Sequence, residues 1–385
     1  MLRALDEPGG IAVYARNLAE ELLRLDRDNH YVLFYRSREH LGRLEAFDNA
    51  TEVWLPSRSK LTWDQLAVPR ACRRAQVDVV LHPKFTVPLL APCPAVMVVH
   101  GADWFVPEQA QYYPWLDVRY VRAVMPLYFR RAAVVVSVSR LTTENFERSL
   151  KAARGKTRTV YFGPARHFAR VEDEAIRQTV LDRYGLPPDF IFTLTKRRGG
   201  HRKNLANLLA GYGELHARHP GAPKLVVGGM DCHLFREEHG LDTAEYGADV
   251  LFPGWIDQAD LPAIYSSARL FLYPSNLEAF PIPITEALAC GTPIVTSNVN
   301  GLEEIAGDAA LLVDPDDPTA IADAAAEVLA DPELRERLSR SGLERSKLFG
   351  WERCAREMLD ILSEVARGSR AGKSRRARRD RPGQE

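Results

Sequence analysis

Short runs of β-branched and other apolar residues alternate with longer helix-like segments along nearly the whole chain. Strands that alternate with helices are typical of parallel sheets covered by helices on both faces. Strands that are buried on both faces read as continuous apolar runs, and AVVVSV and LFLY are of this kind. The alternation therefore predicts an α/β protein.

The pattern divides into two halves, each with its own series of strands and helices. In the first half we expect strands at 31–36, 51–55, 77–81, 95–100 and 133–139, and helices at 11–25, 60–74, 115–131 and 140–151. In the second half we expect strands at 189–196, 223–229, 248–254, 269–275, 292–298 and 310–315, and helices at 203–218, 259–267, 283–290, 301–307, 318–330 and 333–348.

Two domains follow from this division, because 385 residues exceed what one hydrophobic core ordinarily holds. The charged stretch 164–188 separates the halves, and the predicted domains are residues 1–170 and 171–350. Both are expected to be doubly wound, Rossmann-like parallel-sheet domains that face each other across a cleft. A final helix over 351–366 is expected to return to the first domain.

The composition excludes several classes of protein. Five cysteines without a CxxC pair indicate reduced thiols, as in the cytosol, and no disulfide framework or zinc site. The most apolar stretch, 77–100, is interrupted by four prolines, which excludes a membrane span. The opening MLRALDEPGG is too short and too charged for a signal peptide. These features predict a cytoplasmic protein.

The charge is distributed unevenly along a chain that is neutral as a whole. Residues 367–385 hold eight Lys or Arg and two Asp or Glu, and almost no apolar side chain. Such a tail cannot bury enough surface to offset its ordering entropy, so we expect it to be disordered. A solvated terminus is the favoured interpretation. Peripheral contact with an anionic inner membrane face is the alternative, and a specific nucleic-acid partner is not expected.

The beginning of the chain departs from the usual doubly wound pattern, which opens with an apolar strand, a glycine turn and a helix. PGGIAVYARNLAEELL supplies the turn and the helix, but MLRAL is a poor strand. Either the first strand is minimal or the chain begins late, and we favour the second explanation. Gly9 and Gly10, at the start of the helix, allow close approach of the backbone to a phosphate or sugar.

The segment EAFPIPITEALACG places Glu278 in a loop after a strand and Glu286 in the first turn of the following helix. Open α/β sheets bind ligands at this carboxyl edge. Ionised carboxylates accept hydrogen bonds from vicinal hydroxyls, and a helix N-terminus attracts an anion. A nucleoside diphosphate sugar has this layout of diol, pyrophosphate and hexose. Alternatively, Glu286 only favours the helix dipole and Glu278 is solvated.

Two further features lie at predicted carboxyl edges. The segment KRRGGHRK carries Lys196, Arg197, Arg198, Arg202 and Lys203 after the first strand of the second domain, where cations would neutralise a diphosphate. His100 ends a strand of the first domain. A solvated basic loop and a structural histidine are the simpler alternatives. Two D-x-D sequences, at 26–28 and 314–316, are interpreted as turns and not as metal sites.

At this point the residues resemble glycosyltransferase family 4, a family of retaining enzymes with the GT-B fold that use nucleotide-activated sugars. The most specific resemblance is the E-x7-E of Glu278 and Glu286, followed by ALACGTPIVTSNVNGLEEIAGDAALLVDPDDP. It continues, in the family's order, in PGGIAVYARNL, TWDQLAVPR, VVHGADWFVPE, VSVSRLTTENF and FGWERCAREML, and extends to about residue 366.

The resemblance implies roles for individual positions. Glu278 matches the glutamate that holds hydroxyls of the donor sugar, and Glu286 the one that binds the ribose. Lys203 matches the lysine on the diphosphate, with Arg197 as its companion, although Lys196 or Arg198 could take that place. His100 matches a histidine near the transferred sugar. Gly9 and Gly10 correspond to the glycine turn, and Phe280 and Ile282 are assigned to donor binding.

The implied activity is transfer of a hexosyl unit, mannosyl or glucosyl, from a GDP- or UDP-hexose to a carbohydrate or lipid-linked acceptor with retention of configuration. No cofactor or metal is required by this interpretation, and the product would be a polysaccharide, glycan or glycolipid. A sugar-nucleotide epimerase and a non-catalytic sugar-nucleotide-binding subunit are the alternatives. The chain departs from the family pattern at Ala279, Pro281, Gly101 and the pair Phe162-Gly163, which replaces an asparagine-glycine turn.

Overall fold

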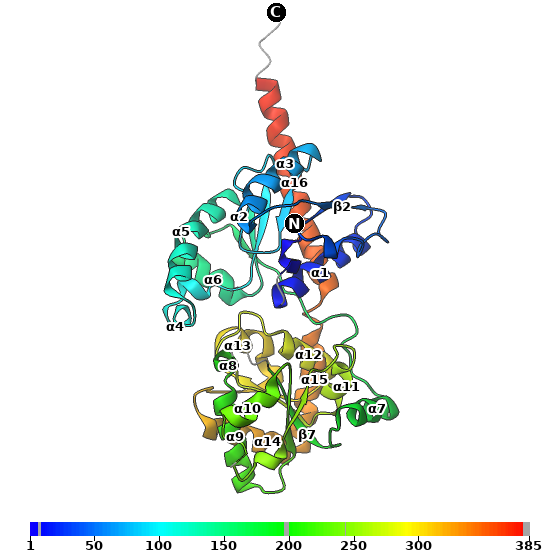
Figure 1. Ribbon diagram of the computed structural model, residues 1–385, viewed down its shortest axis with the longest axis vertical. Helices are drawn as coiled ribbons and strands as arrows, with labels where there is room; N and C mark the ends of the chain where they lie inside the picture. Colours follow the sequence, from blue (N-terminus) through cyan, green and yellow to red (C-terminus); the bar gives the residue numbers. More distant parts are fainter. Residues whose placement is uncertain (7–8, 196–199, 243, 380–385) are drawn as a thin grey trace, which may run out of the picture. The chain divides into compact units, whose positions relative to one another are not determined.

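The computed structural model describes residues 1–6, 9–195, 200–242 and 244–379, and the chain divides into two compact units (Figure 1). The first unit contains Met1–Phe162 and the segment from Trp351 onward, and the second contains Gly163–Gly350. The sequence placed the boundary at residue 170. The residues after Phe162 join the second unit because Phe168 is buried beside the ring of Tyr265.

The first unit contains two parallel sheets. One has two strands, β1 and β2, and the other has four in the order β3-β4-β5-β6. The strands are β1 Tyr31–Tyr35, β2 Ala50–Trp54, β3 Val80–His82, β4 Ala95–Val99, β5 Val134–Ser137 and β6 Thr157–Thr159. All residues of β4 and β5 are buried, as their apolar sequences predict. β6 was not predicted, because the sequence TRT has no apolar run.

The helices of the first unit lie close to their predicted ranges. They are α1 Gly10–Leu25, α2 Lys60–Thr62, α3 Val68–Arg74, α4 Pro107–Ala110, α5 Trp115–Arg131, α6 Arg140–Ser149 and α16 Trp351–Arg379, with short 3-10 turns η1 Arg3–Asp6, η2 Arg38–His40 and η4 Asp103–Phe105. The single helix expected at 60–74 is divided by a π-helix, η3 Trp63–Ala67. This π turn precedes Pro69, whose missing N–H removes one i→i−4 bond.

Residues 1 and 2 lie between the two sheets of the first unit. The Met1 amine donates to the Leu81 carbonyl in β3, and the Leu2 amide donates to the Phe34 carbonyl in β1, at 2.9 and 2.8 Å. The chain then turns into η1 instead of continuing as a strand. Two residues therefore occupy the position where a first strand would pair.

The C-terminal helix α16 packs on the first unit, and it is longer than the 351–366 expected. Trp351 contacts the rings of Tyr14 and Phe162, and Arg158 forms a bidentate ion pair with Glu364. The helix continues to Arg379, through most of the segment that the sequence predicted to be disordered. Arg, Ala and Lys dominate that segment and have high helix propensity, which low hydrophobicity alone does not capture.

The second unit is built on one six-stranded parallel sheet with the order β12-β11-β10-β7-β8-β9. The strands are β7 Phe190–Leu194, β8 Lys224–Gly228, β9 Val250–Gly254, β10 Leu270–Tyr273, β11 Ile294–Ser297 and β12 Ala310–Val313. The chain runs from β7 outward to β9, returns to β10 beside β7, and runs outward again to β12. The strand order therefore reverses between β7 and β10, which makes this pair the topological switch point.

The helices of the second unit cover this sheet (Figure 1). They are α7 Glu174–Tyr184, α8 Gly200–Lys203, α9 Leu205–Arg218, α10 Phe235–Glu238, α11 Leu261–Ser267, α12 Ile282–Cys290, α13 Asn300–Ala306, α14 Pro318–Ala330 and α15 Pro332–Ser346, with turns η5 Cys232–Leu234, η6 Gly247–Asp249 and η7 Gly307–Ala309. Within the described ranges, none of the helices of the chain has an apolar stretch that could span a bilayer.

Both D-x-D sequences make turn and cap bonds. Asp26 accepts from the Asp28 amide at 3.0 Å, and Asp314 accepts from the Asp316 amide at 2.9 Å. Asp317, next in the chain, caps α14 by accepting from the Ala320 amide. The carboxylates satisfy backbone donors at the ends of elements, which is the behaviour of turn residues.

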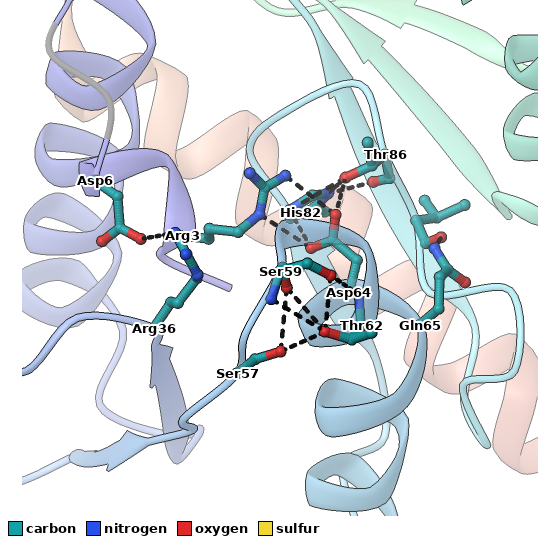
Figure 2. A network of polar contacts seen from close by, with 11 residues as sticks. Arg3, Asp6, Arg36, Ser57, Ser59, Thr62, Asp64, Gln65, His82 and Thr86 are labelled. Atoms are coloured by element: carbon teal, nitrogen blue, oxygen red, sulfur yellow. Dashed lines mark hydrogen bonds and ion pairs between the residues drawn. The ribbon is translucent and has the colours of Figure 1, made fainter. Parts of the chain in front are cut away.

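A buried polar network joins η1, η3 and β3 in the first unit (Figure 2). The Arg3 guanidinium donates to both carboxylate oxygens of Asp64, at 3.2 and 3.1 Å. Thr86 also donates to Asp64, at 3.2 Å, and the His82 ring lies 3.9 Å from the same carboxylate. Burial lowers the pKa of His82 to about 4, although the charge of Asp64 acts in the opposite direction. The imidazole is therefore neutral at pH 7.

His82 should make the stability of this unit depend on pH. The pKa of His82 is lower in the folded state than in the unfolded chain. The contribution of the neutral ring to the free energy of unfolding is therefore complete above about pH 6.5 and is lost as the pH falls toward 4. Between pH 7 and pH 5 we expect the free energy of unfolding of the wild type to fall by about 2 kcal/mol more than that of His82→Gln, because only the wild type has a histidine that titrates at this position. The difference in stability between the two proteins should therefore decrease by that amount. Urea unfolding at both pH values measures it. The exposed His30→Gln is the control, and an unchanged difference between His82→Gln and wild type would contradict the assignment.

Candidate functional site

The carboxyl ends of β7 and β10 bring together residues from two separate loops of the second unit. Lys203 ends α8, which follows β7, and Glu278 lies in the loop between β10 and α12. The Lys203 ammonium donates to Glu278 Oε1 and to the hydroxyl of Tyr273, the last residue of β10. Tyr273 in turn donates to Glu278 Oε1 at 3.1 Å. The described end of the basic segment, at Lys203, therefore meets the acidic loop at the switch point.

The cluster is largely shielded from solvent. Tyr273 is 2% exposed, and the side chains of Lys203 and Glu278 are 20% and 14% exposed. Burial alone would lower the pKa of Lys203, but the adjacent Glu278 charge outweighs it and raises that pKa above its ordinary value. Burial and the same carboxylate raise the pKa of Tyr273. At pH 7 Lys203 is thus an ammonium and Tyr273 a neutral phenol.

Backbone contacts fix the two loops against each other. The Arg202 carbonyl accepts from the Asn276 amide at 2.9 Å and from the Ser275 hydroxyl at 2.8 Å. Asn204 adopts a left-handed conformation, with φ of 55°, and its side chain donates to the Pro315 carbonyl at 2.6 Å. These contacts determine where the Lys203 side chain starts, because they hold the residue on each side of it.

The first turn of α13 supports the backbone of Glu278. The Gly301 amide donates to the Glu278 carbonyl at 2.8 Å. A Cβ atom at position 301 would lie 2.5 Å from the Ala279 carbonyl oxygen and 2.7 Å from that of Glu278. Only glycine permits this approach, because real Cβ contacts are not that short. Gly301 therefore supports the backbone of the loop at Glu278 and Ala279, and it takes no part in the charge cluster.

The second glutamate belongs to a separate contact. Glu286 lies in α12, is 6% exposed, and accepts a hydrogen bond from the buried Tyr265 hydroxyl at 3.0 Å. Burial raises the pKa of Glu286 to about 7, although the Tyr265 bond favours the ionised form. The carboxyl is therefore close to half ionised at neutral pH, and any partner that needs the carboxylate would shift this balance.

The two remaining predicted residues lie at and just before the start of α12. Ile282 is the first residue of α12 and is half-buried, between Pro281 and Pro283. Phe280 is buried with its ring 6.0 Å from that of Phe349, so its side chain is part of the packing. Arg197, with its alternatives Lys196 and Arg198, lies outside the described residues.

The predicted residues of the first unit lie at the start of α1 and the end of β4. Gly9 has φ of 142°, and both Gly9 and Gly10 are exposed, with open space where a Cβ would stand. His100 Nε2 lies 2.9 Å from the Pro83 carbonyl, and its ring packs edge-on against Tyr14. Burial lowers the pKa of His100 to about 4, so the ring is neutral at pH 7.

Three residues of the second-unit site were not identified from the sequence. Tyr273 and Tyr265 read as apolar residues of a strand and a helix, and only their buried hydroxyls reveal a polar role. Gly301 follows Asn300 in an Asn-Gly pair, which signals a turn, and Asn300 does adopt a positive φ of 56°. That signal predicts a special backbone conformation but not the contact with Glu278.

Comparison with known families divides the chain in the same way. Residues 8–163 match the family described as Glycosyltransferase Family 4, and residues 177–345 match Glycosyl transferases group 1. The two matches together cover most of both units. They include Gly9, Gly10 and His100 in the first region, and Lys203, Glu278 and Glu286 in the second.

Individual relatives agree with these matches. O-antigen chain mannosyltransferase B of Escherichia coli is 41% identical over 111 residues, which are 29% of each chain, so the match spans less than a third of that protein. Sucrose-phosphate synthase from Thermosynechococcus elongatus has the same fold, with a TM-score of 0.72, 24% identity, and coverage of 93% of this chain and 94% of that one. HepE of Anabaena, solved with UDP and glucose, gives a TM-score of 0.69 at 18% identity, with coverage of 93% and 96%. The chain has the GT-B fold and belongs to glycosyltransferase family 4.

Proposed function

We propose that this protein transfers a hexosyl unit from a nucleotide sugar to an acceptor hydroxyl with retention of anomeric configuration. The observation that supports this most is the cluster of Lys203, Glu278 and Tyr273 at the switch point of the second sheet. A mannosyl or glucosyl donor carried by GDP or UDP is proposed, because one relative is a mannosyltransferase and one structural neighbour holds UDP and glucose. The acceptor is proposed to be a carbohydrate or a lipid-linked sugar.

The diphosphate of the donor would bind between Lys203 and the start of α12. An ammonium and a helix N-terminus both favour an anion at that place. Pro281 and Pro283 have no N–H, so the Ile282 amide is the backbone donor that this turn offers. As the bond to the sugar breaks, negative charge grows on the diphosphate, and fixed positive groups that stabilise such charge contribute strongly to catalysis. Arg197 is proposed as a second cation there.

The two glutamates would bind the two ends of the donor. Glu278 accepts hydrogen bonds from Lys203 and Tyr273 in the structure, and a carboxylate has further lone pairs for sugar hydroxyls. Glu286 would bind the ribose diol through the oxygen atoms of its carboxylate. Its raised pKa means that nucleotide binding draws the carboxyl toward the ionised form.

His100 would contact the transferred sugar from the first unit. A carbonyl oxygen only accepts, so the contact with Pro83 places the ring proton on Nε2 and leaves Nδ1 as an acceptor in the neutral imidazole. Gly9 and Gly10 would allow the phosphate or the acceptor to approach the α1 terminus. The acceptor's proton is proposed to pass to the departing phosphate, on the same face of the sugar.

A labelled donor distinguishes this function from its alternatives. Incubation with GDP-[14C]mannose or UDP-[14C]glucose and candidate acceptors should move the label to the acceptor, with the donor's anomeric configuration kept in the NMR spectrum of the product. Label that appears in an epimerised nucleotide sugar would indicate an epimerase. Binding without turnover on any acceptor would favour a non-catalytic subunit. A cytoplasmic location with peripheral membrane contact through the basic residues of 367–385 is part of the same proposal.

The ionisation of Glu286 should appear in nucleotide binding. We expect the affinity for GDP or UDP to fall as the pH decreases through about 7, because protonation removes the acceptor that the ribose needs. Glu286→Gln should weaken binding by about 1–3 kcal/mol at pH 8 and remove most of this pH dependence. Calorimetry at pH 6 and pH 8 measures both, with the exposed Glu327→Gln as control. Equal pH dependence in Glu286→Gln and wild type would contradict the role.

Replacement of Lys203 should weaken binding of the nucleoside diphosphate much more than binding of the free nucleoside. We expect Lys203→Ala to lower kcat on the order of 10²-fold and to weaken binding of the nucleoside diphosphate, because the charge that neutralises the leaving group is lost. Binding of the free nucleoside should change little. Steady-state kinetics and calorimetry measure these quantities, with the exposed Lys347→Ala as control. Equal loss of nucleoside and nucleoside diphosphate affinity would place Lys203 away from the phosphates.

A further inference from the structure

Helix α5 of the first unit has apolar side chains on two opposite faces. Val118, Val121, Met125 and Tyr128 are buried and follow helical spacing toward the core. Leu116, Tyr120 and Leu127 are 61%, 56% and 48% exposed, and with Ala123 they follow the spacing of four, three and four residues that defines a single opposite face. An ordinary surface helix has polar residues there. The second apolar stripe is therefore a feature that the core does not require.

Neighbouring segments extend the apolar stripe. Leu89 and Leu90 are 37% and 69% exposed, and their loop is attached to the end of α5, because Arg131 donates to the Leu89 and Ala91 carbonyls at 3.0 and 2.8 Å. That loop is bound in turn to η3, since the Leu89 amide donates to Gln65 at 2.8 Å, beside the 44% exposed Leu66. Three chain segments thus present leucines next to one another.

Arginines lie on both sides of this stripe. On α5, Arg119 and Arg130 flank the stripe on one side and Arg131 on the other, as their helical positions require. The segments 56–74, 83–94 and 115–131 together contain ten Lys or Arg and two Asp or Glu, in a chain whose total charge is zero. One of the two acids, Asp64, is buried in its ion pair with Arg3. The region therefore carries a local positive charge that the whole chain does not.

We propose that the exposed stripe of α5, with Leu66, Leu89 and Leu90, docks on the surface of a bilayer that contains anionic phospholipids. An apolar stripe of leucine and aromatic side chains with arginines on both sides has the composition of an interfacial membrane site. A second copy of the same face is disfavoured as the occupant, because two surfaces of like charge repel each other. This inference does not rest on the proposed transferase activity, since it concerns residues of the first unit and the charge cluster belongs to the second.

Vesicle binding by the full-length protein tests the proposal. Vesicles of phosphatidylcholine with 30% phosphatidylglycerol should bind the wild type in co-sedimentation. Vesicles of phosphatidylcholine alone should bind it at least ~10-fold more weakly, because they offer the arginines no anionic headgroups. Leu116→Ser with Leu127→Ser should weaken binding to the anionic vesicles on the order of tenfold or more, since both side chains would lose their apolar contact with lipid. The matched control is Ile176→Ser with Leu348→Ser, which removes two apolar side chains of similar exposure from the second unit.

The remaining outcomes would overturn the proposal. Unchanged binding by the Leu116 and Leu127 double variant would show that another surface, such as the basic end of α16, carries the contact. A wild-type dimer that this double variant dissociates in analytical ultracentrifugation would show that the face binds a second copy. Absence of binding to anionic vesicles would exclude the membrane as the partner. Circular dichroism of the variants confirms that these exposed substitutions leave the fold intact.

Discussion

The parallel pairing of β7 with β10 is the constraint on which the site in the second unit depends. These strands are far apart in sequence, yet Ile191 pairs with Leu270 and Phe192 with Phe271 in the centre of the sheet. Each strand of a parallel sheet delivers its following loop to the same edge, so the loops after β7 and β10 become neighbours there. Lys203 can reach Glu278 only because no other strand lies between them.

A charge that is buried at such an edge needs a partner whether or not a ligand is bound. Lys203 and Glu278 neutralise each other, and the Tyr273 hydroxyl satisfies part of both. Under the proposed function, a nucleotide sugar does not add charge to an empty pocket. Lys203 and Glu278 would exchange partners, because the ammonium would then pair with the phosphates and the carboxylate would accept from the sugar hydroxyls. The desolvation cost of each group is then already met in the folded protein, before the donor arrives.

The sequence was sufficient for the regular parts of this fold and for the meeting of the two loops. Apolar runs such as AVMVVH and LFLY identify buried strands, and the loops that follow them define the sheet edge. The sequence was insufficient where the physical cause is a contact between distant segments. β6 has the sequence TRT and becomes a strand only because β5 offers it an edge, as the register of Val135 with Thr157 shows. Tyr273 and Tyr265 have hydroxyl partners that no local pattern can indicate.

The departure of Phe162-Gly163 from the family pattern has a structural explanation in the first unit and at its boundary. The Phe162 ring packs 5.1 Å from both Tyr14 and Trp351, and Tyr14 packs against His100. A large ring at 162 thus connects the base of α16 to the residue that supports the histidine. Position 163 has no room for a side chain, because a Cβ atom there would lie 2.6 Å from the Gly350 amide nitrogen. Phenylalanine at 162 therefore makes aromatic contacts within the first unit, while the close passage of the segments at 163 and 350 leaves no room for a side chain at 163.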